Sequence, residues 1–112
     1  MDPRVELERR ERELLRALGR LHADDSALRT DRADATADDE HDPEGSTLSG
    51  EWQRIDGLQR SARAELAEVR AALDRVAAGT YGVCVICGAG IPEGRLEARP
   101  QAATCVACAG AR

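Results

Sequence analysis

The stretch that decides the fold is CVICGAGIPEGRLEARPQAATCVAC, residues 84–108, which holds all four cysteines of the chain in two CxxC pairs. The 17 residues between the pairs match the spacing C-x2-C-x15–20-C-x2-C that is typical of zinc sites. Each CxxC turn directs two thiolates toward one point, so two such turns complete a tetrahedron of sulfur ligands. The sequence therefore predicts one Zn²⁺ bound by Cys84, Cys87, Cys105 and Cys108.

A zinc held by four sulfurs has no open position for water or substrate, so this zinc is expected to be structural. A structural metal would also stabilise a chain with few large side chains, since aromatic residues make up only 2% of this sequence and there is no Phe. A small domain with few large side chains buries too little apolar surface to fold unaided, and a metal supplies the missing stability. The alternatives are a rubredoxin-like iron site and a redox-active dithiol, which would need a depressed thiol pKa.

The N-terminal residues MDPRVELERRERELL are charged throughout, which is unlike a signal peptide. No run approaches the roughly 20 apolar residues that span a bilayer, so no membrane association is expected. We therefore expect a cytoplasmic protein. That compartment is reducing and argues against structural disulfides.

Two apolar stripes precede the cysteines. The first is interrupted by Glu11 and Asp25, whereas the second alternates steps of three and four without a break, as in a coiled-coil seam. Two consecutive helices, each with an apolar seam, predict a mainly α fold. We expect a long antiparallel helical hairpin over residues 1–78, followed by a four-cysteine zinc finger over residues 79–112. The stripes are Leu7, Leu14, Leu18, Leu21 and Leu28, then Trp52, Ile55, Gln59, Ala62, Leu66, Val69, Leu73 and Val76.

Local signals set the ends of these helices. Asp2 can cap a helix that starts at Pro3, Ser46 or Thr47 can cap the second helix, and Gly79 can end it. A second arm of residues 46–78 and a first arm of equal length place the turn of the hairpin at residues 37–45.

The acidity of the chain is concentrated at this turn. Residues 31–45 carry seven acidic residues against Arg32 alone, a net charge of −6, while the whole chain has −5. A run of charge is often only a solvated loop, and that interpretation stays open here. The candidate partner-binding residues at the tip of the hairpin are Asp38, Asp39, Glu40, Asp42 and Glu44.

The segment GTYGVCVICGAGIPEGRLEARPQAATCVAC, residues 79–108, resembles the C4 zinc finger of the DksA/TraR family of bacterial transcription factors. The preceding hairpin with an acidic turn also resembles that family in its architecture. The positions that carry the resemblance are Gly79, Tyr81, Gly82, the four cysteines, Gly88, Ile91, Arg95, Leu96, Ala98 and Pro100.

The resemblance implies a bacterial transcription regulator that binds RNA polymerase. In that family the tip of the coiled coil enters the secondary channel, where its acidic residues approach the active site, and some members act together with ppGpp. The tip pattern DxxDxA of the family has its nearest literal match at residues 31–36, with Thr36 in the last place. Two arms of equal length favour residues 37–45 as the tip instead, because the position of a carboxylate along the hairpin decides whether it reaches the channel.

Other functions fit the sequence less well. Direct DNA binding is not expected, because residues 79–112 carry only Arg95, Arg99 and Arg112 against two glutamates, whereas phosphate contacts need a basic patch. The chain shows no nucleophile–base set and no glycine-rich phosphate loop, so we expect no enzyme. The remaining alternative is a zinc-stapled protein-interaction module or a thiol-based redox sensor with another partner.

Overall fold

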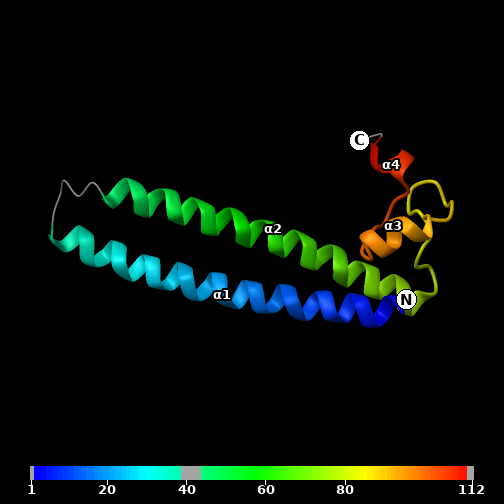
Figure 1. Ribbon diagram of the computed structural model, residues 1–112, viewed down its shortest axis with the longest axis horizontal. Helices are drawn as coiled ribbons and strands as arrows, with labels where there is room; N and C mark the ends of the chain where they lie inside the picture. The colour runs from blue at the N-terminus through cyan, green and yellow to red at the C-terminus, as the bar shows by residue number, and fades with distance from the viewer. Residues whose placement is uncertain (1, 39–43, 111–112) are drawn as a thin grey trace. The chain divides into compact units, whose positions relative to one another are not determined.

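The computed structural model describes residues 2–38 and 44–110, with the backbone alone at Arg32, 34–38 and 44–47. Four helices form in this part of the chain: α1 (Pro3–Asp38), α2 (Glu44–Ala78), α3 (Glu93–Ala98) and α4 (Val106–Gly110) (Figure 1). No β-strand forms within the same ranges, where one isolated antiparallel bridge joins Val83 and Gly90. The predicted mainly α fold is confirmed.

Helix α1 begins as the sequence predicts. The Asp2 carboxylate accepts a hydrogen bond of 3.0 Å from the backbone N–H of Arg4. The Asp2 carbonyl accepts one of 3.1 Å from the N–H of Glu6. Pro3 fits the first helical position, because the N–H it lacks has no partner there in any helix.

Helix α2 ends as predicted but begins earlier. Gly79 has a φ of 77°, and the N–H groups of Gly79 and Thr80 bond to the carbonyls of Val76 and Arg75 at 3.2 and 2.9 Å. These two bonds form a Schellman motif, which requires the left-handed conformation that glycine adopts without strain. The start predicted at Ser46 or Thr47 is wrong, because α2 begins at Glu44. An acidic residue is favourable at that end of a helix dipole.

The chain divides into two compact units. One contains residues 1–13 and 65–112, and the other contains residues 14–64. Each unit takes a segment of α1 and a segment of α2, which run in opposite directions side by side (Figure 1). None of the helices within residues 2–38 and 44–110 combines the length and apolar character needed to cross a membrane.

In the first unit the two helix segments meet through an apolar seam flanked by ion pairs. Leu7, Val69 and Ala72 are completely buried. Beside them Arg70 pairs with Glu11 at 3.0 Å, and a second ion pair joins Arg10 to Glu65. The charges thus lie at the margin of the seam rather than in it.

In the second unit Leu14 and Ile55 are buried, together with the amide side chain of Gln59. The Arg29 guanidinium lies 4.7 Å from the centre of the Trp52 ring and also pairs with Asp25 at 2.8 Å. All the residues of both predicted stripes are buried or half-buried, so the interpretation of the 3-4 spacing is confirmed.

Candidate metal centre

The first CxxC turn, here called the first knuckle, is residues 84–87. The carbonyl of Cys84 accepts the N–H of Gly88 at 3.0 Å, and the N–H of Cys84 donates to the carbonyl of Ala89 at 2.8 Å. The chain reverses here because Gly88 takes a φ of 76°, which favours glycine. This reversal turns the sulfurs of Cys84 and Cys87 toward the same side.

The second knuckle is residues 105–108, and it opens α4. The N–H of Ala109 donates to the carbonyl of Cys105 at 3.0 Å. The first knuckle is joined to the segment just before the second, since the N–H of Val85 donates to the carbonyl of Ala103 at 2.9 Å. The fold therefore brings together two CxxC pairs that are 17 residues apart in the sequence.

Two side chains, one before the first knuckle and one between the knuckles, hold the segment that precedes the second knuckle. The Tyr81 hydroxyl donates to the carbonyl of Pro100 at 2.8 Å, and the Arg95 guanidinium donates to the carbonyl of Thr104, also at 2.8 Å. Ile91 and Ala102 are buried and form the small apolar core of the finger. Because that core is so small, a metal is needed to hold the knuckles together.

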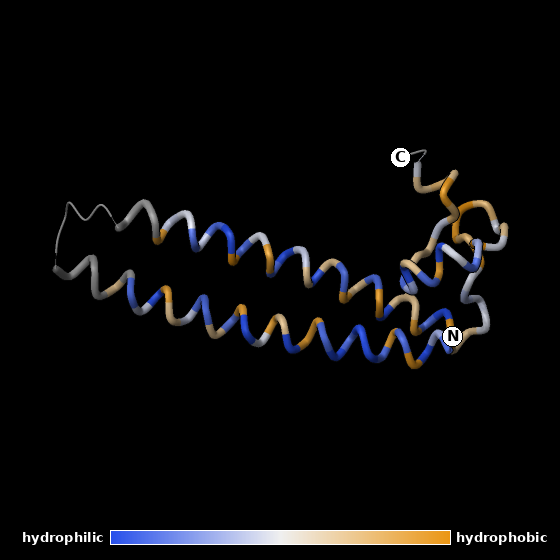
Figure 2. Tube along the Cα trace, viewed as in Figure 1, coloured by the Kyte–Doolittle hydropathy of each residue, from blue (hydrophilic) through white to orange (hydrophobic). Residues whose placement is uncertain are grey.

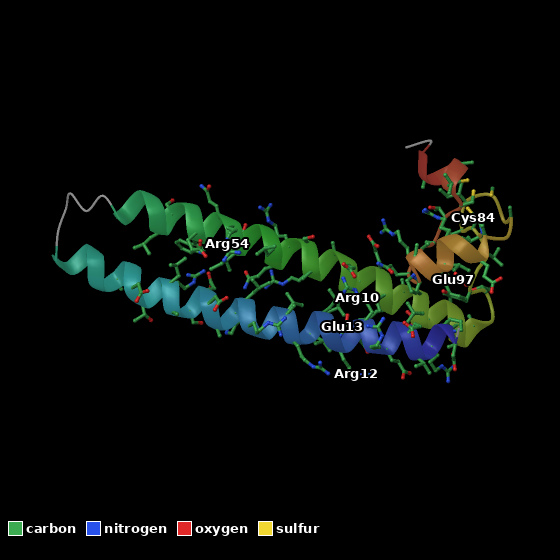
Figure 3. The ribbon with its side chains drawn as sticks, in the orientation of Figure 1. Arg10, Arg12, Glu13, Arg54, Cys84 and Glu97 are labelled. Atoms are coloured by element: carbon green, nitrogen blue, oxygen red, sulfur yellow. The ribbon has the colours of Figure 1, made fainter. Side chains whose placement is uncertain are left out.

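The four cysteine sulfurs lie within 4.8 Å of one another, and Figure 3 shows the sulfur atoms gathered near Cys84. The sulfurs of Cys87 and Cys105 are 3.8 Å apart, far beyond a disulfide bond. A tetrahedral zinc with Zn–S bonds of about 2.3 Å has sulfur–sulfur edges of about 3.8 Å. The cluster therefore fits the ion that the spacing predicts.

The environment favours thiolate at part of the cluster. The backbone amide of Cys87 bonds to the Cys84 sulfur and lowers the pKa of that thiol to about 6. The pKa of Cys105 is lowered as well, chiefly by the backbone amide of Cys108. The pKa of Cys108 is raised to about 12, because its thiol donates hydrogen bonds to the other sulfurs, first to Cys105. A divalent cation is what would allow all four to be thiolates.

The structure describes no side chain among the predicted tip residues. Asp39, Glu40 and Asp42 lie outside the described residues. Asp38 is the last residue of α1 and Glu44 the first of α2, and the structure gives their backbone alone.

Sequence reasoning missed the part that Arg95 plays inside the finger. A contact with a partner or simple solvation is what its charge and place in the sequence suggest. Its guanidinium also holds the backbone just before Cys105. Every residue has a main-chain carbonyl, so nothing in this one sequence indicates which residue accepts the bond.

The finger and the fold are both similar to those of known proteins. Residues 79–112 match the family described as the prokaryotic dksA/traR C4-type zinc finger. The structure of the DnaK suppressor protein from Agrobacterium tumefaciens C58 is similar to this chain, with 35% identity and a TM-score of 0.62. That similarity covers 98% of this chain and 90% of the Agrobacterium protein.

Two further relatives extend the comparison. Transcription factor DksA2 from Pseudomonas aeruginosa shares the fold, with 23% identity, a TM-score of 0.56 and coverage of 96% of this chain and 82% of that one. An uncharacterized protein of Aquifex aeolicus (strain VF5) is 44% identical over 55 residues, which are 49% of this chain and 38% of the Aquifex protein. This chain therefore aligns with well under half of the length of that curated relative.

The family of the finger and the four-cysteine cluster together support a structural zinc in this chain. The Agrobacterium protein resembles the chain over nearly its whole length, hairpin included. On this likeness, and on the match of the finger itself, the chain belongs to the DksA/TraR family.

Proposed function

We propose that this protein is a bacterial transcription regulator that binds RNA polymerase, with the tip of its helical hairpin entering the secondary channel. The observation that carries the proposal is the likeness to the Agrobacterium DnaK suppressor protein over 98% of the chain. The name of the Pseudomonas DksA2, a transcription factor, supports the same class of function.

The proposal divides the work between two parts of the chain, the hairpin of residues 1–78 and the finger of residues 79–112. Cys84, Cys87, Cys105 and Cys108 hold the zinc, which stabilises the finger and has no catalytic part. The finger and the adjacent helix ends supply most of the affinity for polymerase. The acidic residues between α1 and α2 supply the effect on transcription, by bringing carboxylates near the catalytic Mg²⁺ or the mobile elements around it.

The bounds of the helices are consistent with this division. Helix α1 ends at Asp38 and α2 begins at Glu44, so the acidic block predicted for the tip lies at and between their ends in the sequence. Carboxylates are also the ligands that Mg²⁺ prefers in proteins, which gives the acidity a chemical purpose at a polymerase active site.

The experiment pairs a binding assay with a promoter transcription assay, using purified bacterial RNA polymerase. The combined variant Asp39→Asn, Asp42→Asn, Glu44→Gln removes the charge and keeps the shape of each side chain. It is expected to change transcription strongly while altering the affinity less than tenfold, under about 1.4 kcal/mol. A tip variant that regulates like the wild type would reduce the acidic block to a solvated loop.

Two further arms complete the experiment. The transcription assay with and without ppGpp tests whether this alarmone is a co-effector, as in some members of the family. A wild-type chain that fails to bind polymerase would leave the alternative, a zinc-stapled interaction module or redox sensor with another partner.

A further inference from the structure

Exposed aliphatic side chains gather in the finger. Of the seven large hydrophobic residues that are exposed in the described part of the chain, four lie within residues 83–106. The most exposed are Val106 at 63%, Val85 at 58% and Ile86 at 55%. We call these three residues the knuckle patch, because each occupies one of the two middle positions of a CxxC turn.

The fold brings the patch together from two distant parts of the sequence. Val85 and Ile86 lie between the first two cysteines and Val106 between the last two. The sulfurs of all four cysteines lie within 4.8 Å of one another, so the two knuckles meet. In Figure 2 the chain is coloured as hydrophobic along both knuckles. The three side chains thus lie on the two turns that surround the metal site.

Packing within the finger does not explain these residues. Its interior is formed by Cys84, Ile91 and Ala102, which are at most 7% exposed. Apart from the cysteines, residues 79–92 and 100–110 offer no charged side chain, since they contain no Asp, Glu, Lys or Arg in a chain in which these four make up 33%. Exposed apolar side chains that gather in one small part of a molecule are typical of a protein-binding site.

A hollow beside the patch adds positive charge. It is lined by Val85 together with Arg75, Arg95 and Arg99, against the single carboxylate of Glu68. Each guanidinium has five N–H donors. Arg95 uses one on the carbonyl of Thr104, and Arg99 lies 3.5 Å from Glu68, so donors remain for a partner. The complementary surface carries carboxylates next to aliphatic side chains.

We infer that the knuckle patch, with Arg99 at its border, is the face by which the finger docks on a protein surface of aliphatic side chains bordered by carboxylates. This inference rests on the proposed function, under which that surface belongs to RNA polymerase. The patch itself offers no cation to a phosphate backbone, so a nucleic acid does not fit it.

The test is the affinity of zinc-loaded variants for purified bacterial RNA polymerase. Ile86→Ser and Val106→Ser, alone and combined, remove apolar surface without touching a cysteine. The combined variant is expected to weaken binding by about tenfold or more, as at the centre of an interface. Leu58→Ser is the matched control, because Leu58 is 44% exposed on α2 in the unit of residues 14–64, which contains neither the finger nor the helix ends adjacent to it. It should leave the affinity within about twofold.

Two more variants separate docking from folding. Ile86→Leu keeps the apolar surface and is expected to bind like the wild type. Arg99→Glu reverses the charge at the border, and it is expected to weaken binding and reduce the dependence of the affinity on salt. If the serine variants lose zinc, the affinity of Arg99→Glu tests the inference in their place, because Arg99 lies outside both knuckles. An Arg99→Glu variant that binds polymerase as tightly as the wild type would then overturn the inference.

The remaining outcomes are distinct. Patch variants that bind as tightly as a polymerase-binding wild type would overturn the docking face and leave the proposed function standing. A wild type that does not bind polymerase would overturn both. Self-association that Ile86→Ser abolishes, with polymerase binding unchanged, would assign the patch to a second copy of the chain instead.

Discussion

The hydroxyl of Tyr81 donates a 2.8 Å hydrogen bond to the carbonyl oxygen of Pro100 and so ties the chain before the first knuckle to the chain before the second. Tyr81→Phe keeps the ring and removes the bond, leaving the half-buried carbonyl with one partner fewer. We expect a loss of about 1 kcal/mol in the unfolding free energy of the zinc-loaded protein. Thermal or denaturant unfolding measures it, and an unchanged midpoint would mean that the bond contributes nothing.

The same residue gives a pH dependence. Burial is the main reason that the pKa of Tyr81 is raised above its ordinary value. Because the folded state favours the neutral phenol, this contribution to stability is complete below about pH 10 and is lost as the pH rises through the folded pKa. Tyr81 is the only tyrosine, so phenolate absorbance reports it alone. The midpoint should fall toward about 10 in denaturant.

Metal removal should separate the finger from the helices. The purified protein is expected to contain one zinc per chain, and elemental analysis showing mainly iron would contradict this. Substituting Cys84 by Ser, or adding a strong chelator, should abolish the order of the finger because its apolar core is small. Much of the helical circular dichroism should remain, since both stripes lie before residue 79.

The seam of α2 can be tested with one substitution at two positions. Leu66 is 7% exposed and Leu58 is 44% exposed. Leu66→Asp should cost several kcal/mol by burying an unpaired charge, whereas Leu58→Asp places the same charge in water. The mild change Arg63→Ala should also be tolerated. Equal unfolding midpoints for the two aspartate variants would mean that the hairpin seam is wrongly assigned.

The ion pair between Glu11 and Arg70 should matter little. The two groups are 3.0 Å apart, but 55% of the Arg70 side chain is exposed. Exposed pairs are typically worth less than about 1 kcal/mol and are screened by salt. A double-mutant cycle of Glu11→Gln and Arg70→Gln measures the coupling at low and high salt. A coupling that is large and independent of salt would show that the pair is effectively buried.

Much of this fold could be predicted because its signals are periodic or local. The step of three and four from Trp52 to Val76 identifies α2, and the preference of glycine for positive φ places its end at Gly79. The start of α2 could not be placed, because Glu44, Ser46 and Thr47 all suit the first turn of a helix and only their context decides among them.

The cysteine cluster was also predictable, since ligand chemistry demands that spacing. The hydrogen bonds that support the cluster could not be predicted. The bonds from Tyr81 to Pro100 and from Arg95 to Thr104 end on backbone oxygens, which every residue possesses. The exposure of Val85, Ile86 and Val106 was equally hidden, because apolar residues beside a small core suggest burial.

The stacking of Arg29 on Trp52 has a practical consequence for folding studies. Trp52, the only tryptophan, lies in the unit of residues 14–64, and the only tyrosine lies in the unit that contains the finger. The nearby guanidinium makes indole emission sensitive to the pairing of α1 with α2. Trp52 emission can therefore follow the pairing of α1 with α2, and Tyr81 can follow the folding of the finger around the metal. The two events can be measured separately in the unlabelled protein.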